Sequence, residues 1–182
     1  MKKLLGISLM VLSASAFADS YTGPKGLTVG VGYSMGTFDP DEGSSFDLSA
    51  VQFRLGNELN QNFAVRFDYL IGTGEESKSI GGIDYKLELD SAFSLLLQPK
   101  LALNEKVEAY GLIGFTSASF TASASNAFAS QSEENSDTSL SYGAGIGGNI
   151  KDNIGAYAEY VSYIQEDDYD FGGLNLGVTF GF

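Results

Sequence analysis

Residues 174–182 read LNLGVTFGF, and this stretch contains the pattern that decides the fold. Every second residue is large and apolar, and the residues between them are Asn, Gly or Thr. Successive side chains of a β-strand point to opposite faces of the sheet, so the pattern predicts a strand with one apolar face and one small or polar face. Residues 27–35, LTVGVGYSM, repeat the alternation near the other end of the chain.

Six further segments show the same alternation, and together they predict eight strands. They are residues 51–55, 63–71, 85–97, 107–117, 140–147 and 154–165. In 85–97 we assign the large residues to one uninterrupted apolar face, namely Tyr85, Leu87, Leu89, Phe93, Leu95 and Leu97. In 107–117 both faces carry apolar residues. In 154–165 the outward face is either Ala156, Ala158, Tyr160 and Ile164, or Tyr157, Val161 and Tyr163. We choose the first set, because it leaves Glu159 on the polar face.

The connections between these segments alternate between short and long. The short ones, 57–61, 104–106 and 151–153, are rich in Asn and Asp, which tolerate turn conformations. The long ones, 37–46, 73–82, 117–138 and 166–172, are polar, and we expect the Ser/Ala-rich stretch 117–132 to be a flexible exposed loop. An up-and-down antiparallel sheet places every second connection at the same end. The sequence therefore predicts an all-β fold, an eight-stranded antiparallel up-and-down barrel with tight turns at one end.

Alternation alone does not say which face of the barrel lies outside. A soluble lipocalin-like barrel turns its apolar face inward around a ligand, whereas a transmembrane β-barrel turns it toward lipid. Here the apolar faces extend over about 9–11 residues per strand, the length of a tilted membrane strand. The other face is mostly Gly, Ala, Ser and Thr, which suits the narrow interior of eight strands. We therefore predict a transmembrane barrel and keep a soluble periplasmic ligand-binding barrel as a remote alternative.

The first 18 residues have the pattern of a secretory signal peptide. Lys2 and Lys3 precede the apolar run 4–12, and the small residues Ala16 and Ala18 form a cleavage pattern. The apolar run is too short for a membrane-spanning helix, which needs about 20 residues. We expect residues 1–18 to be the signal peptide and residues 19–182 to be the barrel domain.

Several glycine-rich segments strengthen this interpretation. Residues 29–33 read VGVGY, residues 142–147 read YGAGIG, and the chain ends in LGVTFGF. With its size and its eight amphipathic strands, the sequence resembles the small OmpA/OmpX-type outer-membrane β-barrel family. The resemblance implies a monomer in the outer membrane of a Gram-negative bacterium, in contact with membrane lipid and lipopolysaccharide. It also implies that the barrel-assembly machinery reads the last strand, through Leu174, Leu176, Val178, Phe180 and Phe182.

Composition removes most catalytic chemistry. The 182 residues include no cysteine and no histidine, so thiol catalysis, thiolate metal sites and the commonest general base are absent. Outer-membrane barrel enzymes that share the fold rely on a catalytic histidine, so we expect no enzyme, no catalytic residues and no cofactor. A net charge of −13 disfavours nucleic acid as a partner. The acidic connections lack the spacing of a calcium loop, so we expect solvated surface charge and no metal site.

Charged residues also occur on the polar faces of the predicted strands. We expect Arg54, Arg66, Asp68 and Glu159 to pair across the lumen as a structural plug, because unpaired charge there is costly. The alternative is that they line a narrow porin-like channel for small solutes or ions. The sequence thus predicts a structural or surface-interaction role, through envelope integrity or adhesion-type contacts of extracellular loops. It does not name an extracellular partner.

Overall fold

The structure is a computed structural model that describes residues 26–41, 43–80, 83–125 and 130–182. The predicted signal peptide, with its cleavage residues Ala16 and Ala18, lies outside the described residues. None of the described residues forms a helix that is long and apolar enough to cross a membrane.

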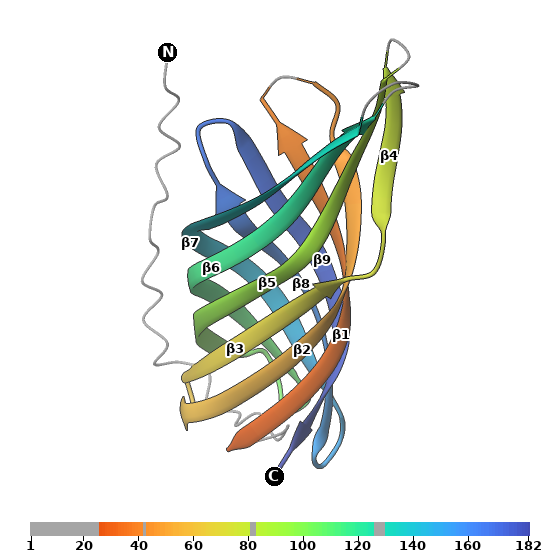
Figure 1. The fold of residues 1–182 in the computed structure, drawn as a ribbon. Coiled ribbons are helices and arrows are strands. Elements are labelled where there is room, and N and C mark those ends of the chain that lie inside the picture. The colour runs from red at the N-terminus through yellow and green to blue at the C-terminus, as the bar shows by residue number, and fades with distance from the viewer. Residues whose placement is uncertain (1–25, 42, 81–82, 126–129) are drawn as a thin grey trace.

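Nine strands make up the described chain, and all neighbours in the sheet are antiparallel. Their bounds are β1 Leu27–Pro40, β2 Phe46–Asn60, β3 Phe63–Gly72, β4 Glu75–Ile80, β5 Ile83–Ala102, β6 Val107–Ser125, β7 Ser130–Lys151, β8 Ile154–Gln165 and β9 Tyr169–Gly181. β1 pairs with both β2 and β9, and β3 pairs with β5, which closes eight strands into a barrel (Figure 1). β4 continues from β3 after a break at Thr73 and Gly74 and pairs with β5 beyond the closed ring. The predicted eight-stranded antiparallel barrel is confirmed.

Alternation along each strand separates an outer face from the lumen. On β9, Leu174, Leu176 and Phe180 point outward and are 42%, 44% and 39% exposed, whereas Asn175 between them is fully buried. Val178 is half-buried and Phe182, just after the strand, is exposed. The five residues predicted as an assembly signal thus share the outer face of the last strand or continue from it. The outer wall is apolar and the lumen contains the polar groups, as in a membrane barrel.

Two β-bulges reverse the alternation that we predicted. In β5 the pairing with β6 shifts between Leu89 and Ser91, so Tyr85, Leu87 and Leu89 lie on the lumen side of the strand, and our outward assignment for these three was wrong. Leu87 and Leu89 are buried. Phe93, Leu95 and Leu97, beyond the bulge, face outward as predicted. In β8 the pairing shifts between Ser162 and Ile164, and Ile164 is fully buried instead of facing outward. The remaining outward residues of this strand, Ala156, Ala158 and Tyr160, lie as predicted.

The Ser/Ala-rich stretch is not the flexible loop that we expected. β6 and β7 stay paired in register from Ser117↔Thr138 to Ser125↔Ser130. Cross-strand hydroxyl contacts join Ser119 to Ser136 at 2.7 Å and Ser123 to Ser132 at 3.1 Å. The two strands therefore extend past the apolar wall. The ends of β5, β6 and β7, together with β4, form a sheet that stands above one side of the barrel (Figure 1).

An aromatic cluster fills the lumen toward this extended end, and it consists of Phe38, Phe120, Tyr163, Tyr169 and Phe171. Ring centroids lie 5.3 Å apart for Phe38 and Phe120, 5.2 Å for Phe120 and Phe171, and 5.5 Å for Tyr163 and Phe171. Phe171 and Tyr163 are almost completely buried. This cluster separates the polar middle of the lumen from the end of the barrel where β4 lies, which we call the loop end. The opposite end, with the connections 61–62, 103–106 and 152–153, is the turn end.

Candidate functional site: a charge network across the lumen

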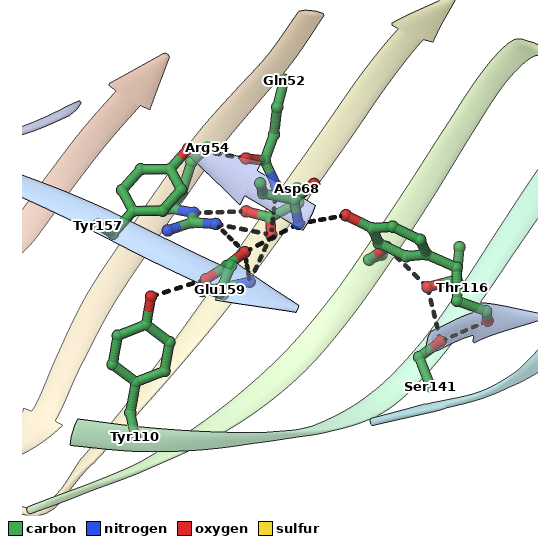
Figure 2. Close-up of polar contacts among 12 residues, drawn as sticks. Gln52, Arg54, Asp68, Tyr110, Thr116, Ser141, Tyr157 and Glu159 are labelled. Atoms are coloured by element: carbon green, nitrogen blue, oxygen red, sulfur yellow. Dashed lines mark hydrogen bonds and ion pairs between the residues drawn. The ribbon is translucent and has the colours of Figure 1, made fainter. Parts of the chain in front are cut away.

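The middle of the lumen contains a charge network formed by Arg54, Arg66, Asp68 and Glu159. Figure 2 labels Arg54, Asp68 and Glu159 of this network. Arg54 Nε lies 2.9 Å from Asp68 Oδ1, and Arg54 Nη2 lies 2.6 Å from Glu159 Oε1. Arg66 donates to both oxygens of Glu159 at 2.8 Å, and its Nη2 also lies 2.8 Å from Asp68 Oδ2. The structure therefore brings together all four residues that the sequence analysis selected for the lumen.

Strand register explains why these four side chains meet. Arg66 and Asp68 are two residues apart on β3, so they share one face, and Asp68 is directly opposite Arg54 of β2. Glu159 reaches the pair from β8, on the far wall of the barrel, so its contacts with Arg54 and Arg66 cross the lumen. Arg66, Asp68 and Glu159 are 2%, 0% and 1% exposed. Two cations and two anions balance within this enclosed space, which the cost of burying charge requires.

Neutral polar residues complete the network, and the sequence analysis missed them. Tyr110 donates to Glu159 Oε2 at 2.8 Å and Asn175 to Glu159 Oε1 at 3.2 Å. Gln52 donates to Asp68 at 3.1 Å and accepts a 2.7 Å hydrogen bond from Tyr157. The Arg54 guanidinium also lies 3.8 Å from the centre of the Tyr157 ring. The parity of each strand was the available signal, since Gln52 shares a face with Arg54, and Tyr157 shares one with Glu159.

Glycines in the lumen make room for these large side chains. A Cβ atom placed on Gly32 or Gly177 would lie less than 3.0 Å from the Tyr157 hydroxyl oxygen. A Cβ on Gly145 would lie 2.7 Å from the ring of Tyr110. The inward glycines of the repeated Gly-x-Gly segments are thus the spatial complement of the two tyrosines that surround the network.

Further polar contacts lie on either side of the network. Toward the loop end, the hydroxyls of Ser94, Thr116 and Ser141 form a chain with 2.7 Å and 2.6 Å contacts, and Ser141 donates to the carbonyl of Tyr163 at 2.9 Å. At the turn end, Lys100 pairs with Glu58 and lies 3.7 Å from Glu108. Lys100 was also missed, because it lies beyond the predicted strand 85–97, whereas β5 continues to Ala102. These contacts leave little unpaired charge along the lumen.

The loop end is strongly acidic in the described part of the chain. Its cations are Lys86, which lies 2.5 Å from Glu75, and Lys78, which lies 3.7 Å from Glu76. The hydrogen bond to Glu75 raises the pKa of exposed Lys86. Burial and a 2.6 Å hydrogen bond to Asp137 raise the pKa of Tyr169. The carboxylates of this end are Asp39, Asp41, Asp47, Glu75, Glu76, Asp84, Glu88, Asp90, Glu133, Glu134, Asp137, Glu166, Asp167, Asp168 and Asp170. No group of three or more metal-ligating residues with the geometry of a metal site occurs among the described residues.

Comparison with known proteins places this geometry in a family. Residues 5–182 match the family described as outer membrane protein beta-barrel domain. The crystal structure of Ail, the attachment invasion locus protein of Yersinia pestis, is similar with a TM-score of 0.64 and 25% identity, covering 86% of this chain and 98% of that one. Ail in complex with the heparin analogue sucrose octasulfate gives a TM-score of 0.63 and 27% identity over the same shares, 86% and 98%.

Neisserial surface protein A has the same fold, with a TM-score of 0.60 and 19% identity over 88% of this chain and 99% of that one. A search of curated protein sequences gave no match. The family match spans nearly the whole chain, and the similar solved structures are covered almost completely. The chain belongs to the outer membrane protein β-barrel family, as a small eight-stranded barrel of the OmpA/OmpX type.

Proposed function

We propose that this chain is a non-enzymatic outer-membrane protein with a structural or surface-interaction role. The proposal includes export by the signal peptide at 1–18 and a monomer that contacts membrane lipid and lipopolysaccharide. Outer-membrane barrels place short turns in the periplasm and longer connections outside the cell. The turn end is accordingly periplasmic in this proposal, and the loop end, with β4 and the ends of β5, β6 and β7, is extracellular.

The paired charge network in the lumen is the observation that supports this role. Glu159 joins Arg54 and Arg66 across the barrel, and the aromatic cluster fills the lumen above it. An interior filled in this way offers no wide path for solutes, as is usual for eight strands. The extracellular sheet is then a surface available for contact with another molecule or cell.

The relatives support contact with other cells but not an identical ligand. Ail is named for attachment and invasion, and one Ail structure contains a heparin analogue. A sulfated polyanion is repelled by a surface on which many carboxylates face two lysines that are already paired. We therefore expect the partner of this chain to differ in charge from a sulfated sugar.

Surface display tests this role. The chain is produced in the outer membrane of a laboratory Gram-negative strain, and attachment of the bacteria to cultured cells is counted beside detergent sensitivity of the envelope. Residues 122–133 are replaced by Asn-Gly, a favoured two-residue hairpin turn, because Ala122 pairs with Glu133 and the remaining register is kept. We expect attachment to fall while the barrel keeps its shift in gel mobility on boiling. Unchanged attachment and unchanged envelope sensitivity, relative to cells without the protein, would refute the proposal.

A narrow channel is the second candidate, and one observation favours it. A polar cavity of about 60 Å³ lies beside the network toward the turn end, and Arg66, Glu58 and Glu108 are among its lining residues. Arg66 Nε is buried there without a hydrogen-bond partner in the described part of the chain. A polar cavity of this size accommodates water. If the lumen conducts, Arg66→Ala is expected to alter the single-channel current in a planar bilayer. A current equal to that of the unchanged chain would exclude the network as the gate.

A further inference from the structure

A second cavity lies at the loop end, above the aromatic cluster. This mouth cavity has a volume of about 460 Å³ and is lined by β1 and β2 on one side and by β5, β6 and β7 on the other. Its apolar lining includes Phe38, Phe46, Tyr85, Leu87, Ala122 and Ala124. Ligand-binding cavities commonly have volumes of about 300–1,000 Å³, so the mouth cavity has room for one large side chain and its neighbours.

Packed aromatic rings keep the lower part of the mouth cavity rigid. Phe38 stacks on Tyr169 with 4.6 Å between the ring centroids, and its edge-on contact with Phe120 connects it to the aromatic cluster. The β5 bulge turns Leu87 toward the same space. The cavity is therefore a preformed apolar surface, and binding there does not have to order it first.

The charged residues around the mouth cavity determine which ligand charge it favours. Lys86 lines the cavity but is held by Glu75, and Lys78, whose Nζ lies 5.0 Å from the centre of the Phe46 ring, is held by Glu76. Glu133 also lines the cavity, and no hydrogen bond or ion pair engages its side chain among the described residues.

The nearby β8–β9 connection adds more negative charge at the same end. Asp167 and Asp168 are exposed there, and the backbone N–H of Asp41 donates to the carbonyl of Asp168 at 2.9 Å, which joins this connection to the end of β1. An apolar cavity surrounded by unpaired carboxylates is complementary to a ligand that combines an apolar body with positive charge.

We propose that the mouth cavity binds a short basic and apolar segment of a partner protein, in which a large apolar side chain is flanked by Lys or Arg. The apolar side chain fills the cavity above Phe38 and Phe46. The flanking cations pair with Glu133 and with the carboxylates of the β8–β9 connection. The inference rests on the proposed surface-interaction role and names the chemistry of the partner.

The absence of tryptophan from this chain permits a direct test. The full mature chain is refolded into vesicles of zwitterionic lipid and titrated with the peptide acetyl-Lys-Trp-Lys-amide, whose indole is then the sole source of tryptophan fluorescence. Empty vesicles correct for partition into lipid. We expect a saturable blue shift of the emission. The affinity is expected to fall as the salt concentration is raised, because salt screens the attraction between the carboxylates and the lysines of the peptide. Acetyl-Glu-Trp-Glu-amide is expected to give no saturable shift.

Two variants locate the binding, and a neighbouring residue supplies the control. Ala122→Phe fills the cavity and is expected to abolish the saturable shift. Glu133→Gln is expected to weaken binding about two- to fivefold, the usual value of one exposed ion pair. Glu134→Gln makes the same chemical change one residue along β7, where the side chain points to the other face, and is expected to bind normally.

Three results would overturn the inference: equal binding of the acidic peptide, no saturable shift with the basic peptide, or normal binding by an Ala122→Phe protein that still shows heat-modifiable mobility. If Ala122→Phe does not fold, the test is the comparison of the peptide affinities of Glu133→Gln and Glu134→Gln. Equal affinities of these two variants would overturn the inference. Peptide binding without attachment of displaying cells would instead count against the proposed function alone. Attachment without peptide binding would count against this inference alone.

Discussion

Replacing Glu159 with glutamine tests how much the charge network contributes to stability. Glu159 accepts hydrogen bonds from Arg54, Arg66, Tyr110 and Asn175, and its carboxylate balances one of two buried guanidinium groups. The variant leaves both arginines with Asp68 as their one anion in the network, so one positive charge is uncompensated in a buried lumen. Removing one partner of a buried ion pair lowers the free energy of unfolding by about 3–5 kcal/mol. Because the glutamine oxygen keeps some of these hydrogen bonds, we expect a loss near the lower value, about 3 kcal/mol.

The measurement is equilibrium urea unfolding from lipid vesicles, followed by the loss of β-type circular dichroism and of the gel-mobility shift. Glu134→Gln is the matched control, because its side chain is exposed on β7, and it is expected to change stability by less than about 0.5 kcal/mol. A Glu159→Gln protein as stable as this control would refute the idea that the network is energetically coupled to the fold.

Removing one cation together with the anion separates charge balance from lost contacts. The double variant Glu159→Leu/Arg66→Met keeps the 2.9 Å pair of Arg54 and Asp68, and the charge of the remaining network is again zero. We expect the double variant to lose about 1–3 kcal/mol less unfolding free energy than the summed losses of the single variants Glu159→Leu and Arg66→Met. This difference is the range of coupling between contacting residues. Additive single effects would show that charge balance is not what the network maintains.

Three further changes test the packing and the assembly of the barrel. Gly177→Val is expected to destabilise the barrel by about 1–3 kcal/mol, because its side chain meets the Tyr157 hydroxyl, and Tyr157→Ala in the same chain is expected to recover part of that loss. Phe171→Ala empties part of the aromatic cluster and is expected to cost about 3–5 kcal/mol in urea unfolding, clearly more than Phe115→Ala on the exposed outer face. Deletion of Phe182 is expected to lower the amount of folded protein in the outer membrane without changing the stability of protein refolded in vitro; an equal loss in both would argue against an assembly signal.

Periodicity predicted most of the fold because a closed barrel repeats one rule along every strand. Strands such as β1 and β9 have no bulge in their mutual pairing, so their faces follow the alternation of the sequence throughout. The failures at Tyr85, Leu87, Leu89 and Ile164 have one physical cause: a bulge inserts an extra residue and exchanges the two faces beyond it. No composition signal in the sequence marks those positions.

The site was predicted as far as charge is conspicuous. Arg54, Arg66 and Glu159 stand out in otherwise small or apolar strands, and burial of opposite charges required them to meet. Tyr110 and Tyr157 did not stand out, because a tyrosine on a barrel strand faces lipid as readily as the lumen. The β6–β7 extension was missed for a related reason, since Ser and Ala were interpreted from composition instead of from cross-strand pairing.

The charge network also bears on how the chain selects one register out of several. A strand that slips by one residue exchanges its two faces completely. For β2, β3 or β8 such a slip would move Arg54, Arg66 or Glu159 from the lumen to the lipid and leave the opposite charges unpaired. An arginine facing the middle of the bilayer costs about 2–4 kcal/mol, and the abandoned partner adds its own penalty. Because Glu159 joins β8 to β2 and β3 across the lumen, the four charged side chains penalise a slipped register in three strands at once.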